Sequence, residues 1–206
     1  MKFYPRNRVE KARRLRRKGL SAGKIGKRLG IGNGTILRWC IDIHSNNPTH
    51  LQNQRRRAKM KKKGIESIDS FNFTPKEAKI FASLLYWCEG CRYPASTFVG
   101  FSNSDVLLVK TFLEFFRKGF HPEENKLKVH LQLHTTHDKK KMIPFWSRLL
   151  KIPKTQFFKP TITPPTGRMK RFNYKGTCAV RYYDLSVLLE MMGIYEGLAR
   201  KILKIK

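Results

Sequence analysis

The stretch Ala82-Ser83-Leu84-Leu85-Tyr86-Trp87-Cys88-Glu89-Gly90 is an apolar run that ends in a single carboxylate and a glycine. Thr74-Pro75-Lys76-Glu77 precedes it, and there Thr and Glu have the spacing of a helical capping box while Pro suits the first helical position. Between the two, apolar residues recur one helical turn apart. The pattern predicts one amphipathic or buried helix that begins after Thr74 and ends at Glu89.

Charge is distributed unevenly along the chain. The 206 residues include 44 Lys and Arg against 14 Asp and Glu, a formal net charge of +30, and residues 1–63 alone hold 20 basic and 2 acidic residues. A field of this sign attracts polyanions, so we expect nucleic acid as the partner. With 40% hydrophobic and 12% aromatic residues, the chain has the material for a folded core.

Membrane attachment and secretion are not expected. No apolar run reaches the roughly 20 residues of a membrane-spanning helix, and the N-terminus lacks the apolar core of a signal peptide. Four cysteines lie in or beside predicted helices and strands, so we expect reduced thiols at Cys40, Cys88, Cys91 and Cys178. The sequence therefore predicts an intracellular protein of the cytoplasm, nucleoid or nucleus.

Residues 1–43 are predicted to form three short helices. The first runs from about Arg8 to Lys18, Ser21 caps the second, and Asn33 caps the third after a turn that contains Gly30. This spacing resembles a helix-turn-helix DNA-binding domain of the homeodomain-like or resolvase-like kind. A basic three-helix domain that docks on another partner is the alternative.

The helix-turn-helix resemblance implies two sets of DNA contacts. Three side chains of the third helix would project towards base edges: Asn33, Thr35 and Arg38. Four cations would meet phosphates: Arg16, Arg17, Lys27 and Arg28.

Residues 44–73 are predicted to be a basic, flexible linker. They are poor in large apolar side chains, and their like charges repel and extend the segment. The cations cluster in its middle: Arg55, Arg56, Arg57, Lys59, Lys61, Lys62 and Lys63. On DNA we expect this segment to lie along phosphates or in the minor groove.

Residues 74–206 are predicted to form an α+β domain. Residues 99–120 and 131–150 repeat one pattern of strand, Asp cap and amphipathic helix, and a last helix over 185–205 is expected to break or kink near Gly193. Strands over 156–163 and 176–183 are expected to form a hairpin whose loop carries three DNA contacts, Arg168, Lys170 and Arg171. The order predicts helices on one face of an antiparallel sheet, with the other face free to saddle a duplex.

The stretch from Ala82 to Gly90 resembles the signature helix of the LAGLIDADG homing endonucleases. In that family two such helices pack side by side, and each ends in an acidic metal ligand above a scissile phosphate. Leu84 stands where the motif has Gly and Trp87 where it has Asp, while four positions match: Ser83, Leu85, Glu89 and Gly90. The strand and helix predicted after residue 98 also resemble the family, so the resemblance runs from Thr74 to the C-terminus.

The LAGLIDADG resemblance implies a Mg²⁺ site. The Glu89 carboxylate would hold the ion against DNA, with the Gly90 carbonyl beside it. A basic side chain on the sheet would polarise the attacking water, and the candidates are Lys159, Lys175 and Arg181. Because the chain has one good copy of the motif, we expect a homodimer on double-stranded DNA. A monomer in which Glu196 pairs with Glu89 is the alternative.

Zinc is not expected, although two residue pairs have the outline of a zinc site. Cys88 and Cys91 have the spacing of half a site, but His134 and His137 are separated by two residues where a finger has three to five.

Different functions fit these residues. Glu89 favours a Mg²⁺-dependent DNA endonuclease. Leu84 and Trp87 favour a non-cutting regulator, similar to bacterial sporulation regulators that combine a degenerate LAGLIDADG-like domain with a helix-turn-helix in the opposite order. RNA binding is a third possibility, through stacking on rings that core packing explains more simply: Phe98, Phe101, Tyr174 and Tyr182.

Overall fold

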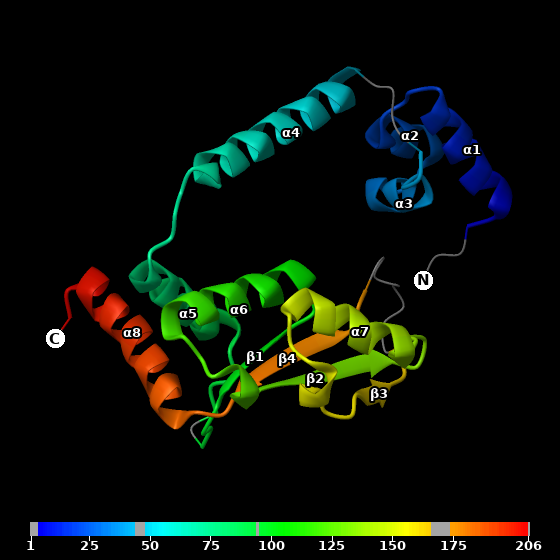
Figure 1. Ribbon diagram of the computed structural model, residues 1–206. Helices are drawn as coiled ribbons and strands as arrows, with labels where there is room; N and C mark the ends of the chain where they lie inside the picture. The colour runs from blue at the N-terminus through cyan, green and yellow to red at the C-terminus, as the bar shows by residue number, and fades with distance from the viewer. Residues whose placement is uncertain (1–3, 44–47, 94, 166–173, 206) are drawn as a thin grey trace. The chain divides into compact units, whose positions relative to one another are not determined.

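The computed structural model describes residues 4–43, 48–93, 95–165 and 174–205. The chain divides into two compact units, Met1–Phe71 and Asn72–Lys206. Within the described residues the fold is α+β, with eight α-helices and a four-stranded mixed sheet (Figure 1). The α+β class predicted from the sequence is thereby confirmed.

The N-terminal unit begins with three helices, α1 (Arg6–Arg17), α2 (Ala22–Leu29) and α3 (Asn33–Trp39). As predicted, Ser21 caps α2, where its hydroxyl accepts a hydrogen bond from the Lys24 N–H at 3.2 Å. The prediction that Asn33 caps α3 is wrong, because the extended Gly32 is the N-cap and Asn33 is already helical. One small core holds the helices together through Ala12, Ala22, Ile25, Ile31, Ile36 and Cys40.

Residues 48–69 form a continuous helix, α4 (Pro48–Asp69), where the sequence predicted a flexible linker. Like charges within the segment oppose a helix, but Arg, Lys, Gln, Ala and Met are strong helix formers, and the segment contains no Pro after Pro48. Every side chain from Leu51 to Asp69 is exposed. Intrinsic propensity, rather than packing against a core, therefore accounts for this helix.

Four helices belong to the C-terminal unit: α5 (Pro75–Glu89), α6 (Val106–Phe120), α7 (Lys139–Leu150) and α8 (Leu185–Leu203). The predicted capping box is present, since Thr74 Oγ1 accepts from the Glu77 N–H at 3.2 Å and Glu77 accepts from the Thr74 N–H at 2.7 Å. Asp105 and Asp138 cap α6 and α7, as the repeated pattern predicted. Of the break or kink predicted near Gly193, the break is wrong, because α8 continues through this residue.

The sheet consists of β1 (Val99–Asn103), β2 (Leu127–His134), β3 (Thr161–Thr163) and β4 (Thr177–Tyr182), in the order β1-β4-β2-β3. The predicted antiparallel sheet and hairpin are wrong, because β2 lies between β3 and β4, and β3 runs parallel to β2. A parallel pair needs a crossover connection, and α7 supplies it between β2 and β3. The predicted strand over 156–163 is interrupted: a 3₁₀ turn covers Lys154–Gln156, Phe157 forms an isolated parallel bridge with Val129, and only 161–163 form the strand β3.

The helices α5, α6 and α7 lie on the same side of the sheet (Figure 1). Phe101 of β1 stacks on Phe112 of α6 with ring centroids 4.0 Å apart, and Trp146 of α7 is fully buried. At Gly119 of α6 a β-carbon would come within 2.5 Å of the Lys79 backbone nitrogen, so α5 and α6 touch through the backbone there. The helices thus cover one face and leave the other face of the strands outside this core.

Candidate nucleic-acid interface

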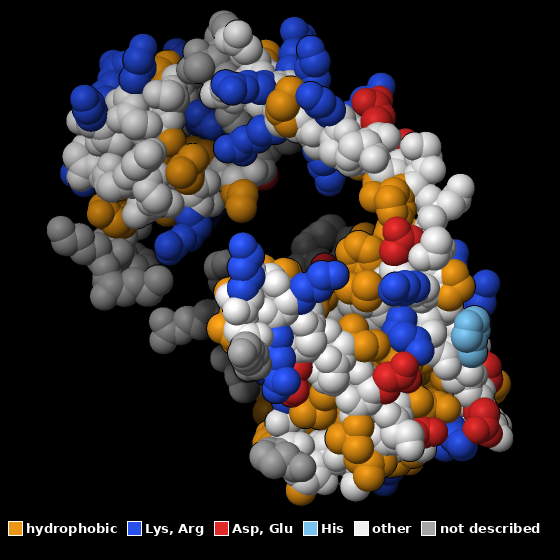
Figure 2. Space-filling view, turned by 90° about the vertical axis from the view of Figure 1, so that its left-hand side faces the viewer, with side chains coloured by type: hydrophobic (Ala, Val, Ile, Leu, Met, Phe, Trp, Pro, Cys, Tyr) orange, Lys and Arg blue, Asp and Glu red, His pale blue; other side chains and the backbone are white. Residues whose placement is uncertain are grey.

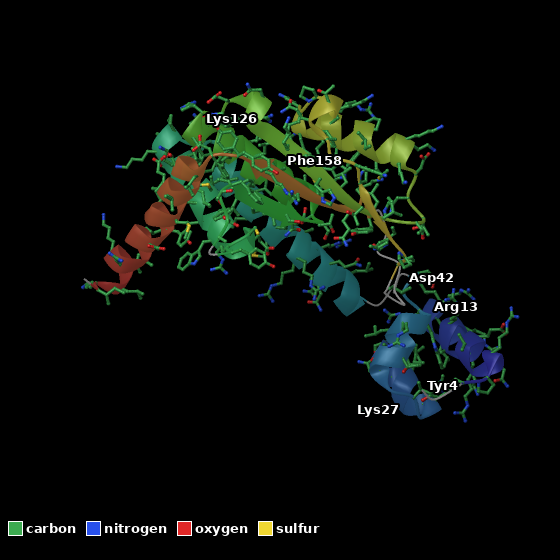
Figure 3. All side chains as sticks on the ribbon, turned by 90° about the horizontal axis from the view of Figure 1, so that it is seen from below. Tyr4, Arg13, Lys27, Asp42, Lys126 and Phe158 are labelled. Carbon is green, nitrogen blue, oxygen red and sulfur yellow. The ribbon has the colours of Figure 1, made fainter. Side chains whose placement is uncertain are left out.

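Arg13 and Asp42 join the first helix of the N-terminal unit to the segment after the third (Figure 3). The guanidinium donates two hydrogen bonds to the carboxylate, the Nη1–Oδ1 distance being 2.8 Å, and a third to the Trp39 carbonyl. The hydrogen bonds from Arg13 are the main cause that lowers the pKa of Asp42. This contact fixes the end of α3 against α1.

The connection between α2 and α3 is tight. Gly30 adopts the left-handed conformation (φ 64°) that lets α2 end sharply, and Ile31 then enters the core. At Gly26 a β-carbon would stand 2.6 Å from the Ile31 carbonyl oxygen, so the turn lies directly on α2. The two glycines therefore set the angle at which α3 leaves α2.

Most of the predicted DNA contacts of this unit are exposed. Asn33 and Arg38 are exposed on α3, Thr35 is half-buried, and Arg17, Lys27 and Arg28 are exposed on α1 and α2. Leu37 and Ile41 are also exposed, by 50% and 85%, and the sequence analysis missed them. Leu37 lies on α3 and Ile41 follows the C-cap Cys40, and two large apolar residues beside the polar Arg38 and Asp42 were the signal in the sequence.

Arg16 is buried, although a phosphate contact was predicted for it. Its Nη1 donates to the Leu20 carbonyl oxygen at 3.1 Å. Its Nε is buried without a hydrogen-bond partner in the described part of the chain. Arg16 thus stabilises the turn after α1 instead of lying exposed for a phosphate, because Leu15 and Leu20 draw this side of α1 into the small core.

The cations of α4 lie close together in the chain, within residues 55–63. Figure 2 shows Lys and Arg side chains along this helix, and all six predicted contacts are exposed: Arg55, Arg56, Arg57, Lys61, Lys62 and Lys63. Lys59, in the same run, is exposed as well. Lys62 lies 3.4 Å from Glu66 in a solvent-exposed pair. An unpacked basic helix of this kind has its charges free to approach phosphates.

Glu89 ends α5, as predicted, and its side chain is exposed. Its carboxylate accepts a hydrogen bond from the Asn103 side-chain amide at 3.1 Å, a partner that the sequence analysis missed. Asn103 ends β1, the strand that follows α5 in the chain. A polar residue at this strand end was the signal in the sequence that could have indicated a partner for Glu89. Among the described residues, no three His, Cys, Asp or Glu side chains gather as a metal-binding group.

The chain after Glu89 runs along the edge of the sheet. Gly90 forms an antiparallel bridge with Phe101, and the Cys91 N–H donates to the Gly100 carbonyl at 2.7 Å. A β-carbon on Gly90 would collide with the ring and carbonyl oxygen of Tyr86, so only glycine fits. The predicted metal-ligand pair of Glu89 and Gly90 is therefore held at the outer edge of β1.

The three candidate basic residues for catalysis lie in different parts of the C-terminal unit's chain. Lys159 and Lys175 were predicted to lie in strands, and this is wrong. The exposed Lys159 precedes β3, and Lys175 precedes β4. The Lys175 ammonium lies 5.6 Å from the Phe145 ring centroid of α7. Arg181 is in β4, as predicted, opposite Gly100 and Lys128.

Glu89 and Arg181 belong to opposite faces of the sheet. Asn103, the partner of Glu89, is paired with Cys178, which is fully buried under the helices. Arg181 lies three residues further along β4, and because side chains alternate along a strand it points to the other face. No contact between Glu89 and a candidate base is found among the described residues. Arg168, Lys170 and Arg171 lie outside the described residues.

The face of the sheet without helices carries polar and basic side chains, which we call the open face. Seven of its residues alternate along their strands with core residues, and Thr161 of β3 is in register with one of them, Gln132. The open face comprises Ser102, Lys128, His130, Gln132, His134, Thr161, Thr177 and Arg181. His130 Nε2 lies 3.0 Å from Thr161 Oγ1. Burial, and then the charge of Arg181, lowers the pKa of His130.

The cysteine and histidine pairs considered for zinc are far apart. Cys91 lies beside Gly100, which is in register with Arg181 and Lys128, whereas His134 is six residues further along β2, about 20 Å at the rise of a strand. His137 is engaged by backbone: the His134 N–H donates to its Nδ1 at 2.9 Å, and its Nε2 is 3.0 Å from the Tyr174 carbonyl oxygen. The four side chains do not converge.

Comparisons with protein-family models, with curated proteins and with solved structures found no match to this chain. None of the described helices is both long and apolar enough to span a membrane.

Proposed function

We propose that this protein binds double-stranded DNA through its N-terminal unit, with α2, the Gly30 turn and α3 acting as a helix-turn-helix. The observation that carries the proposal is the tight α2–α3 connection at Gly26, which presents α3 with exposed Asn33, Leu37 and Arg38. A second helix presented at a fixed angle is the geometry with which such domains enter the major groove.

The charges around this geometry support the proposal. Arg17, Lys27 and Arg28 are exposed on the helices before α3, and the α4 cations follow it in the chain. Cations of this kind position a protein on phosphates, while Asn and Arg side chains in the groove read bases. In this arrangement Asn33 and Arg38 give specificity and the remaining cations give affinity.

The test compares base-reading and phosphate-contacting variants. Duplexes selected from a random library are titrated with the full chain between 50 and 200 mM salt, followed by fluorescence anisotropy. Arg38→Ala is expected to weaken the selected duplex and relax its sequence preference, whereas Lys27→Ala weakens all duplexes alike and reduces the salt slope by about 1. Lys201→Ala, an exposed charge of α8, is the matched control. Affinity that does not depend on salt would refute the proposal.

Mg²⁺-dependent cleavage by a homodimer is the second candidate function, and the exposed Glu89 carboxylate at the end of α5 favours it. Carboxylate and carbonyl oxygens are ligands that Mg²⁺ prefers, and the Gly90 carbonyl is adjacent in the chain. Asn103 turns its NH2 group toward Glu89, while its amide oxygen accepts from the Asp105 N–H, so it would position the carboxylate. A bound Mg²⁺ would supply charge neutralisation at the phosphate and an activated water. The separation of Glu89 from Arg181 makes DNA binding without cleavage, as in a regulator, the better supported of the two.

Cleavage is tested with supercoiled and linear DNA libraries in the presence of Mg²⁺. A nuclease is expected to lose cutting in Glu89→Gln and in Asn103→Ala, while both variants still shift DNA. Loss of cutting in Glu196→Gln as well, by a protein that sediments on DNA as a monomer, would favour the intramolecular pair over the homodimer. If the wild-type chain shifts specific DNA fragments in a gel without cutting them, the hypothesis of a non-cutting regulator is supported and that of a nuclease is refuted.

A further inference from the structure

The open face combines positive charge with a lack of acid. Within the described residues the four strands contain no Asp or Glu, although the chain has 14 of them. Lys128 of β2 and Arg181 of β4 are directly opposite in the antiparallel register. Like charges opposite each other destabilise a sheet, so the protein alone gains nothing from this pair. A bound polyanion would turn the same pair into a favourable contact.

Aromatic rings flank Arg181 on this face. Its guanidinium carbon lies 5.4 Å from the Phe98 ring centroid and 5.8 Å from that of Phe158. Tyr183 extends the row, with its ring centroid 5.2 Å from that of Phe98. Phe158 is labelled on the C-terminal unit in Figure 3, where its N–H donates to the Val129 carbonyl at 2.8 Å and so fixes it to β2.

The rings remain available to a ligand. Phe158 is 40% exposed and Tyr183 is 43% exposed. Gly100, opposite Arg181, has no side chain, and a β-carbon there would stand 3.0 Å from the Phe98 ring, so this ring lies over the strand itself. Exposed rings beside cations form a platform on which unpaired bases stack while cations hold the phosphates. Bases in a duplex are already stacked on one another and cannot use such a platform.

We propose that the open face binds single-stranded nucleic acid, with one base stacked on Phe158 beside Arg181 and its phosphate held between Lys128 and Arg181. This site is separate from the duplex-binding surface proposed for the N-terminal unit, and it does not depend on that surface. His130 borders the phosphate position, because it is two residues from Lys128 on the same face of β2.

The first test separates stacking from charge. Fluorescein-labelled dT12 and U12 are titrated with the full chain between 50 and 200 mM salt. Phe158→Ala is expected to weaken binding about 5- to 150-fold at every salt concentration, the loss of one stacked base. Lys128→Gln is expected to reduce the salt slope by about 0.7, the value for one phosphate of a single strand. Lys201→Gln is the control for loss of one positive charge. It should change the salt slope only slightly and leave the affinity for dT12 within twofold of the wild type.

The same variants must leave duplex binding intact. Phe158→Ala is expected to bind a selected 20-bp duplex as the wild type does, because the N-terminal unit holds the duplex. An equal loss for duplex and single strand would overturn the assignment to single strands, and an unchanged dT12 affinity would overturn the site itself. Failure of Arg38→Ala to alter duplex binding would instead count against the helix-turn-helix proposal alone.

A measurement on the wild-type chain guards against misfolded variants. The His130 ring is followed by NMR over a pH titration with and without dT12. A phosphate between Lys128 and Arg181 stabilises the protonated imidazolium, so the pKa of His130 is expected to rise when dT12 binds. A titration midpoint that does not move while dT12 is bound would refute the site.

Discussion

Arg13 and Asp42 form a two-pronged ion pair across 29 residues of sequence, from the middle of α1 to the chain after α3. Charged side chains that meet through two parallel hydrogen bonds impose an orientation as well as an attraction. The pair holds the end of the proposed DNA-reading helix in place, so its loss should act on both stability and binding.

Asp42→Asn is expected to loosen the N-terminal unit, and the effect is expected to depend on pH. The pKa of Asp42 is lowered in the folded protein, so the pair contributes stability above the unfolded value of about 3.9, and this contribution is lost as the pH falls through the folded pKa. Amide hydrogen exchange of α3 should therefore be faster in the variant at pH 7 and should converge with the wild type below that pKa. Asp69→Asn, an exposed acid of α4, is the control, and equal exchange in both variants would show that the pair contributes nothing.

Gly26 and Gly23 offer a matched comparison within α2. Gly26→Ala should destabilise the unit by about 1–3 kcal/mol, because its β-carbon would overlap the Ile31 carbonyl oxygen, 2.6 Å away. Gly23→Ala should stabilise it by about 0.5–1 kcal/mol, because nothing lies within 4 Å and alanine favours a helix. Hydrogen exchange of the α2 amides measures both changes, and a shift of the same sign in both variants would contradict the close approach.

Ionisation of Tyr86 is expected to destabilise the C-terminal unit at alkaline pH. Burial is the main cause that raises its pKa to about 12, from the usual value of about 10. Because the unfolded chain releases this proton first, the stability of the C-terminal unit should fall as the pH rises from about 10 to about 12.

Tyr86→Phe is expected to flatten this alkaline dependence. At neutral pH it should cost about 0.5–1.5 kcal/mol, since the hydroxyl donates to the Cys91 carbonyl oxygen in the wild type. Urea unfolding at pH 8 and pH 11 measures both effects. Tyr93→Phe, 76% exposed, is the control, and an alkaline slope that survives in Tyr86→Phe would assign it to another group.

Replacing one cation of α4 by an acid is expected to raise the helicity of this segment and to lower its affinity for duplex DNA. Lys59 is spaced four residues from both Arg55 and Lys63, so Lys59→Glu replaces two repulsive pairs by two attractive ones. The variant should protect α4 amides better from exchange and bind duplex DNA more weakly. Lys59→Gln separates the loss of charge from the new pairs. Improved affinity in Lys59→Glu would show that helix formation, rather than charge, limits binding by this segment.

Local signals in the sequence determined where four of the described helices begin. Ser21, Thr74, Asp105 and Asp138 cap helices as their spacing predicted, because a cap involves only neighbouring residues. The like charges of residues 48–69 predicted a flexible linker, but most of these residues favour a helix and α4 forms. Composition also established the basic character of the chain, which needs no fold to be known.

The partners of the strands and the surroundings of the charges came only from the tertiary structure. The sequence predicted β3 beside β4, but β2 lies there, because strand pairing joins residues far apart in the chain. Likewise, the burial of Arg16, the Asn103 contact to Glu89 and the place of Arg181 on the opposite face depend on which elements pack together. The sequence alone therefore determined the local elements and the charge, while packing at long range decided which side chains can act on one ligand.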